Sequence, residues 1–114
     1  MKRGTIDLTK FPFTDLRSTK RRPAIVISKT ESLKKDLIVA FISSVIPEDL
    51  SKTDLIFDKK NKGFNKSGLK KTSVIKLDKL ATLNKSIFTG ELGYITRDTL
   101  KEINKRLKLA LDLK

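Results

Sequence analysis

The fold is decided by residues 12–28, PFTDLRSTKRRPAIVIS, where a polar and basic stretch runs straight into an apolar one. Residues 24–28 are mostly apolar and include β-branched side chains, which predicts a central strand with apolar contacts on both faces. Pro23 stands at the start of this strand, and Arg22 comes directly before it. The cations at 20–22 have three interpretations: a solvated loop, a docking patch or an active-site arginine.

Other segments predict a mainly antiparallel sheet around this strand. Residues 6–9 alternate apolar and polar side chains, as in a half-buried strand, and Pro12 interrupts that ladder because it has no N–H to donate. Further predicted strands are 37–42, which is also central, 55–57, 72–78, 80–83, which continues or restarts the one before it, and a short strand with a turn within 89–94. Residues 59–71 hold six lysines with Gly63 and Gly68, which predicts a connecting loop. The lysines of this run either track phosphates or are simply solvated, and solvation is the usual meaning of such a run.

The chain is expected to close with an amphipathic helix. Thr96 is a plausible N-cap, and Asp98 suits the first turn because a negative charge interacts favourably with the helix dipole. The predicted apolar stripe consists of Leu100, Ile103, Leu107, Ala110 and Leu111. Many short strands and one final helix predict an α+β fold, a small barrel or strongly bent sheet, and 114 residues suit a single domain over 1–114.

Composition favours some classes of function and argues against others. The net charge is +13, which favours a polyanionic partner such as RNA, DNA or an acidic protein, although a lysine-rich surface can also serve solubility. The chain has no histidine, so the commonest metal ligand and general base are missing, and we expect neither metal nor cofactor. The lack of cysteine fits a reducing cytoplasm, and neither a signal peptide nor a membrane-spanning stretch is visible.

Three separated segments resemble one protein family. They are RGTIDLTKFPFTDLRSTKRRPAIVIS at 3–28, DLIVAFISS at 36–44 and GLKKTSVIKLDKLATLNKS at 68–86. Together they resemble MazF/PemK-type toxins of type II toxin–antitoxin systems, in the right order and over nearly the whole chain. The resemblance implies an SH3-like barrel, a homodimer, and an endoribonuclease that cuts single-stranded messenger RNA without a ribosome. It also implies a cognate antitoxin that lies across the RNA groove, and the charge of this chain suits an acidic one.

The resemblance implies that Arg22 is catalytic, because it matches the arginine of the family's R-P element. Its forked guanidinium can hold two phosphate oxygens at once. Pro23 fixes its own φ near −65° and biases the residue before it toward extended geometry, so Arg22 would project from a rigid root. The alternative is a cation that only docks phosphate or lines a dimer rim.

The family's second site residue is a hydroxyl at the end of the next strand, and the resemblance places it at Ser43, with Ser44 as the rival one position on. Alternatively, a hydroxyl there bonds only nearby backbone. One branch of the family uses an Arg-x-Asp pair where this chain has Lys76 and Asp78. Strand alternation puts both on one face, and Asp78 is a candidate base. That branch also uses a histidine, so its full triad is excluded here, and a surface pair is the alternative.

Expected substrate contacts lie mainly in the loop before Arg22, which borders the RNA groove in the family. Phe13 is a candidate for stacking on a base, although such a residue more often packs in a core. Thr14 and Lys20 belong to the same loop. Lys20 and Arg21 either bind the RNA backbone or are solvated.

Three functions remain open at this stage. Metal-independent RNA cleavage would use the substrate's own 2′-hydroxyl as nucleophile. A second function is a non-enzymatic toxin of the same fold that poisons DNA gyrase, which the R-P element disfavours. A third is a nucleic-acid-binding barrel, for which the positive charge alone would suffice.

Overall fold

The computed structural model describes residues 2–10, 21–29 and 35–114; the expected contacts Phe13, Thr14 and Lys20 lie outside these ranges. The strands are β1 (Thr5–Thr9), β2 (Arg22–Val26), β3 (Asp36–Ser43), β4 (Asp54–Phe57), β5 (Ser73–Asn84) and β6 (Phe88–Tyr94). The helices are the 3₁₀ turns η1 (Phe64–Ser67) and η2 (Lys85–Ile87) and the α-helix α1 (Arg97–Ala110).

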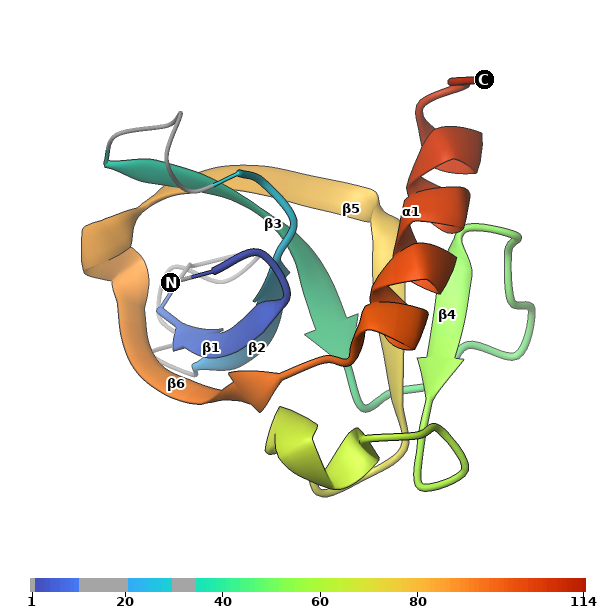
Figure 1. Cartoon of the computed structure of the whole chain (residues 1–114), viewed down its shortest axis with the longest axis horizontal. Coiled ribbons are helices and arrows are strands. Elements are labelled where there is room, and N and C mark those ends of the chain that lie inside the picture. Colours follow the sequence, from blue (N-terminus) through green and yellow to red (C-terminus); the bar gives the residue numbers. More distant parts are fainter. Residues whose placement is uncertain (1, 11–20, 30–34) are drawn as a thin grey trace.

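The strands form one antiparallel sheet in the order β4-β5-β3-β2-β1-β6, so β2 and β3 are central, as the apolar runs predict. The sheet is strongly curved, and β3, β5 and β6 wrap around β1 and β2 (Figure 1). The predicted strands 72–78 and 80–83 are a single strand, β5. Ala40 of β3 lies opposite Leu80, whereas Phe41 lies opposite Lys76, so residues 77–79 form a bulge that lets β5 change direction.

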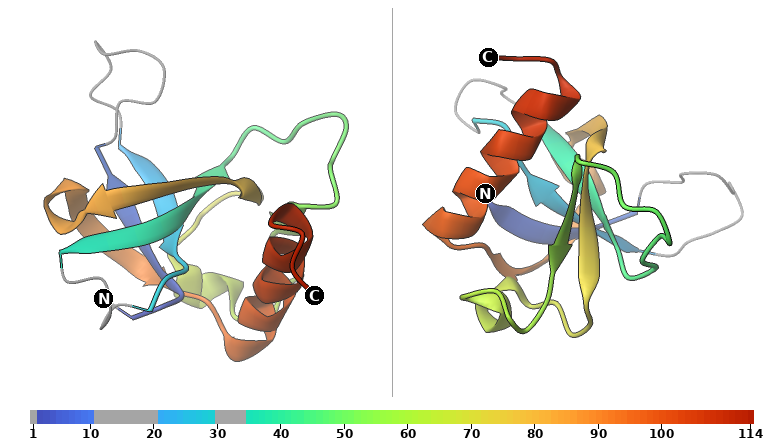
Figure 2. Two further views of the ribbon diagram at one scale, coloured as in Figure 1. Left: turned by 90° about the horizontal axis from the view of Figure 1, so that it is seen from above. Right: turned by 90° about the vertical axis from the view of Figure 1, so that its right-hand side faces the viewer.

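The end strands of the sheet, in the described strand order, are β4 and β6. The short helix η1 contacts both of them, which gives the curved sheet a barrel-like shape. The ring of Phe64 in η1 packs on Phe57 of β4, with 5.2 Å between their centroids. On the other side, a Cβ built on Gly93 of β6 would lie 2.1 Å from the carbonyl oxygen of Lys66. The backbones of β6 and η1 therefore touch directly. Residues 59–71, expected as a loop, contain this short helical closure (Figures 1 and 2).

Gly68 is the glycine whose backbone conformation this closure requires. It follows η1 with a φ of 77°, in the left-handed region that favours glycine. A Cβ on Gly68 would also lie 2.2 Å from the carbonyl oxygen of Leu92. The turn predicted at Gly68 is thus confirmed, and the chain after it is set at a fixed position beside β6.

Two apolar clusters explain why the central strands are apolar on both faces. The larger one includes Ile25 and Ile42 and is covered by Ile103 of α1. The smaller one, on the opposite face, includes Val26 and Val39. Burial on both faces is why β2 and β3 read as continuous apolar runs rather than as alternating ones.

Helix α1 begins where the sequence predicts. Thr96 is the N-cap, and its Oγ1 accepts a hydrogen bond of 3.4 Å from the N–H of Thr99. Leu100, Ile103 and Leu107 contact the larger cluster, which confirms most of the predicted stripe. Leu111 differs, because it follows the last helical residue and is 53% exposed. None of the helices in the described ranges has the length and apolar character of a membrane span.

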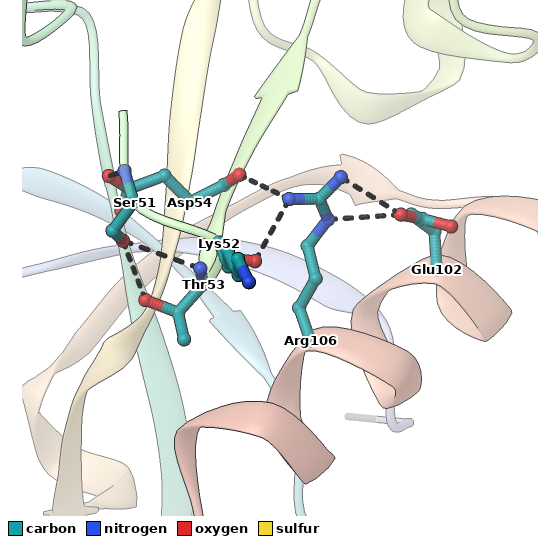
Figure 3. Close-up of polar contacts among 6 residues, drawn as sticks. All are labelled: Ser51, Lys52, Thr53, Asp54, Glu102 and Arg106. Atoms are coloured by element: carbon teal, nitrogen blue, oxygen red, sulfur yellow. Dashed lines mark hydrogen bonds and ion pairs between the residues drawn. The ribbon is translucent and has the colours of Figure 1, made fainter. Parts of the chain in front are cut away.

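Two arginines outside the sheet fasten α1 to it. The Nε of Arg3 donates to the carbonyl of Ile27 at 2.6 Å, and its Nη2 donates to Oδ1 of Asn104 on α1. Burial lowers the pKa of Arg3, but a guanidinium remains charged at neutral pH. Arg106 of α1 reaches the start of the end strand β4, where its Nη1 donates to the carbonyls of Lys52 at 3.1 Å and Asp54 at 2.7 Å (Figure 3).

We predict that Gly93→Ala destabilises the fold by about 2–3 kcal/mol, because the new methyl group would collide with the backbone of η1. Gly90→Ala, in the same strand, is the control, since a Cβ at Gly90 meets nothing within 4 Å. Urea unfolding of both variants measures the difference. Equal stabilities would show that η1 and β6 are not held in direct contact.

We also predict that Arg106→Met lowers the free energy of unfolding by about 1–2 kcal/mol, because two carbonyls lose their donor. Glu102→Gln removes only the 3.0 Å ion pair between Glu102 and Arg106 on the helix surface. That change should cost less than about 0.5 kcal/mol, as is usual for exposed i,i+4 pairs. Equal losses in denaturant unfolding would mean that the ion pair, rather than the link to β4, stabilises α1.

Candidate functional site

A cleft of about 470 Å³ opens where three segments meet at one end of the sheet. The start of β2 contributes Arg21, Arg22 and Pro23. The end of β3 and the residues after it contribute the range 42–45, and the chain leading into β5 contributes Leu69, Lys70, Lys71 and Ser73. We call this hollow the Arg22 cleft. It contains four of the site residues predicted from the sequence: Arg21, Arg22, Ser43 and Ser44.

The antiparallel register explains why these residues meet. Ala24 of β2 lies opposite Phe41 of β3. Arg22 precedes Ala24 by two positions and Ser43 follows Phe41 by two, so both lie at the same end of the pair and on the same face. Ser43 in turn lies opposite Val74 of β5, which brings the chain before β5 to the same edge.

Arg22 has the rigid root expected of it. Its backbone lies opposite Thr9 of β1, and the Oγ1 of Thr9, which is fully buried, donates to the carbonyl of Arg22 at 3.1 Å. Pro23 lies opposite Leu8 and is part of β2. The residue itself is exposed at the cleft. The strand therefore holds the backbone of Arg22 at an exposed position that lines the cleft.

The described lining of the cleft carries positive charge alone. Arg21, Arg22, Lys70 and Lys71 contribute four cations, and no acidic residue is among the described lining residues. Apolar contacts come from Ile42, Val45 and Leu69. Such a lining suits an anion with an apolar part, and fixed cations next to apolar walls stabilise developing negative charge better than cations in open water.

The hydroxyl of Ser43 lies in the cleft and is also used locally. Its Oγ accepts a hydrogen bond of 3.1 Å from the N–H of Val45 and lies 3.4 Å from the carbonyl oxygen of Val45, to which it can donate. The backbone contact considered as an alternative role is therefore present. Because a hydroxyl has one proton and two lone pairs, this contact leaves Ser43 able to bond a ligand as well. Ser44 is exposed at the same place.

Lys76 and Asp78 are not among the residues that line the Arg22 cleft. Lys76 is half-buried in β5 between Phe41 and Asp54 of the neighbouring strands. Asp78 is exposed in the bulge of β5. Among the residues that the structure describes, no group of three acidic side chains is placed to hold a metal ion.

The sequence alone does not place the third wall of the cleft. Lys70 and Lys71 appear in the sequence as part of a charge run, and Leu69 appears as loop. The signal that places them is the pairing of β3 with β5, since the start of β5 must lie beside the end of its antiparallel neighbour. That pairing joins segments more than thirty positions apart, for example Ser43 and Val74.

Comparison with known proteins agrees with this architecture. The family described as PemK-like, MazF-like toxin of type II toxin–antitoxin systems matches residues 2–111. No curated protein matches the sequence significantly.

Several solved structures share the fold at low sequence identity. A mycobacterial endoribonuclease in complex with its cognate antitoxin is 19% identical, with a TM-score of 0.77 over 100% of this chain and 97% of that one. The Mycobacterium tuberculosis toxin MazF-mt6 is 19% identical, with a TM-score of 0.74 over 96% of this chain and 98% of that one. MazF from Deinococcus radiodurans is 17% identical, with a TM-score of 0.70 over 98% and 96%.

Proposed function

The chain belongs to the PemK-like, MazF-like toxin family of type II toxin–antitoxin systems, and we propose that it is an endoribonuclease that cuts single-stranded RNA in the Arg22 cleft. The observation that carries the proposal is the position of Arg22. Its backbone is fixed by Thr9 and followed by Pro23, and the residue is exposed in a cleft lined by cations and by Ser43. Fold similarity to endoribonuclease structures supports the same conclusion.

The proposed reaction needs no metal ion and uses the substrate's own nucleophile. The 2′-hydroxyl attacks the adjacent phosphorus, and the bond from phosphorus to the 5′-oxygen of the next nucleotide breaks. The products are a 2′,3′-cyclic phosphate and a free 5′-hydroxyl. The proton lost by the 2′-hydroxyl goes to water, and the leaving 5′-oxygen takes one from water or from the Ser43 hydroxyl, which water then reprotonates.

In this reaction Arg22 binds the phosphate. Negative charge grows on the equatorial oxygens as the phosphorane forms, and a guanidinium can hold two of them at once. Because the root of Arg22 is already set by β1 and β2, little reorganisation is needed at the moment of reaction. Lys70 and Lys71 add charge from the opposite wall of the cleft.

In this proposal, Ser43 orients the phosphate or passes a proton to the leaving oxygen through its hydroxyl. The proposed reaction assigns no step to Asp78 or Lys76, which are not among the residues that line the cleft. Proton transfer therefore rests on Ser43, on water and on the substrate. None of these is a strong base near neutral pH, so the proposed enzyme is slow.

Two protein partners follow from the family. A cognate antitoxin is the first, since similar structures are complexes with antitoxins, and the net charge of +13 favours acidic antitoxin segments. A second copy of the chain is the other. Leu109, Leu111 and Leu113 at the end of α1 are each more than half exposed, and a dimer would bury such a group.

We predict that Arg22→Ala lowers kcat/KM for RNA cleavage about 10²–10³-fold, the usual effect of removing a group that stabilises transition-state charge. The assay uses a long RNA in EDTA and identifies the new ends, which should be cyclic phosphates. Arg21→Ala is the matched control: it removes the same charge one position earlier and should mainly raise KM. Circular dichroism and unfolding curves verify that both variants fold.

Three results would contradict this assignment. RNA that is bound but never cut would indicate a nucleic-acid-binding barrel. Stalled DNA gyrase without an effect on RNA would indicate a gyrase poison. Cleavage that survives Arg22→Ala would move the chemistry away from this cleft.

The two serines can be separated by the same assay. We predict that Ser43→Ala lowers kcat at least about tenfold, within the range of lost acid–base or hydrogen-bonding catalysis, whereas Ser44→Ala changes it little and Ser43→Thr keeps most activity. Ser43→Ala should also cost about 0.5–1 kcal/mol of stability, because the N–H of Val45 loses its acceptor. A larger loss of activity in Ser44→Ala would assign the hydroxyl to Ser44. If Ser43→Ala lowers stability but leaves kcat unchanged, the role of Ser43 is limited to its hydrogen bonds with Val45.

A further inference from the structure

A second basic cavity adjoins the Arg22 cleft. It has a volume of about 880 Å³ and is built from the chain between β4 and β5. Its cations are Lys59, Lys60, Lys62 and Lys70. We call it the lysine cavity. Leu69 and Lys70 line both this cavity and the Arg22 cleft, so one short piece of chain borders the two hollows.

The lysine cavity has a fixed floor. Phe64 is 7% exposed and packs on Phe57, and Ser67 is fully buried with its Oγ donating to the carbonyl of Phe64. The backbone contact between η1 and Gly93 of β6 also fixes the position of η1. A lysine-rich run in solvent needs no such support. Here the lysines lie on a backbone fixed by packing, and they line the lysine cavity.

The charge in the lysine cavity is of one sign among its described lining residues. Asp58 stands next to the lining, but its Oδ1 accepts the backbone N–H of Lys60 at 2.9 Å. That carboxylate therefore stabilises the turn, and its negative charge offsets only part of the positive charge of the lysines. Lysines 59, 60 and 62 are all exposed, so their ammonium groups can reach a ligand.

We propose that the RNA strand bound in the Arg22 cleft continues over Leu69 and Lys70 into the lysine cavity, where the lysines bind the phosphates of nucleotides flanking the cleaved bond. The inference rests on the proposed RNA substrate. RNA fits better than an acidic peptide because the path starts at the phosphate position of Arg22 and a nucleic acid carries phosphate at every step. Lysines act as point charges that suit backbone contacts independent of sequence.

The test is binding of RNA that cannot be cut. Random-sequence 2′-O-methyl RNA of six and of fourteen nucleotides lacks the attacking hydroxyl, and fluorescence anisotropy measures its Kd. The test variant is Lys59→Gln, Lys60→Gln, Lys62→Gln. The matched control is Lys105→Gln, Lys108→Gln, Lys114→Gln, which removes the same charge at exposed positions on and after α1.

We expect the test variant to bind the fourteen-nucleotide RNA about 5–10-fold more weakly at 0.1 M salt, with a salt-dependence slope smaller by about two, as three lost phosphate contacts require. Binding of the six-nucleotide RNA should change less than twofold, because it fills only the Arg22 cleft. The control variant should bind both lengths nearly as the unaltered chain does.

Three outcomes would overturn the inference. Equal weakening by the control variant would reduce the effect to net charge. Equal weakening for both RNA lengths would place the lysines at the cleft itself. Weaker binding of a fourteen-residue polyglutamate peptide, with RNA binding unchanged, would assign the cavity to an acidic protein.

The same measurements separate this inference from the proposed function. If the length-dependent loss is found but ordinary RNA is never cleaved, the RNA path stands and the nuclease assignment fails. If ordinary RNA is cleaved and the lysine substitutions have no length-dependent effect, the nuclease stands and the extended path fails.

Discussion

The direct contact between the backbones of η1 and β6 is the constraint on which the rest of this fold depends. A curved sheet with β4 at one end and β6 at the other must cover the space between them, and the chain does so with a short 3₁₀ helix rather than with another strand pair. The approach is possible because Gly93 has no side chain and Gly68 adopts a left-handed conformation. Leu69, Lys70 and Lys71, which follow Gly68, therefore lie near the start of β2 and form the third wall of the cleft.

Much of the strand framework could be predicted because burial on both faces leaves a plain signature. The apolar runs around Ile25 and Val39 indicate central strands, and both are central. The helix was also readable, since its cap and stripe lie within a few residues of each other. The bend in β5 was not readable: the pattern is equally consistent with one strand or two, and the bulge becomes visible only through the partners of Leu80 and Lys76 in β3. The lysines of 59–71 likewise concealed the burial of Phe64.

The candidate site divides in the same way. The family resemblance pointed to Arg22, before Pro23, and to Ser43, at the end of an apolar run, and the antiparallel register brings these two residues to one cleft. Lys70 and Lys71 were considered only as part of the lysine run, because their position at the cleft depends on a pairing between distant segments. Asp78 was expected on one face with Lys76, but it lies in the bulge of β5, where regular pairing with β3 is interrupted. Short sequence motifs can identify candidate residues, whereas the strand pairing decides which of them lie close together.

Arg106 has a consequence for how the molecule behaves at high concentration. An open sheet edge is a template on which another chain can add a strand. In β4, the carbonyl of Asp54 is already occupied by a guanidinium from α1, and β6 at the other end is backed by η1. At these two places, elements of the same chain occupy or cover backbone at the ends of the sheet, so less of that backbone is open to pairing with a strand of another chain.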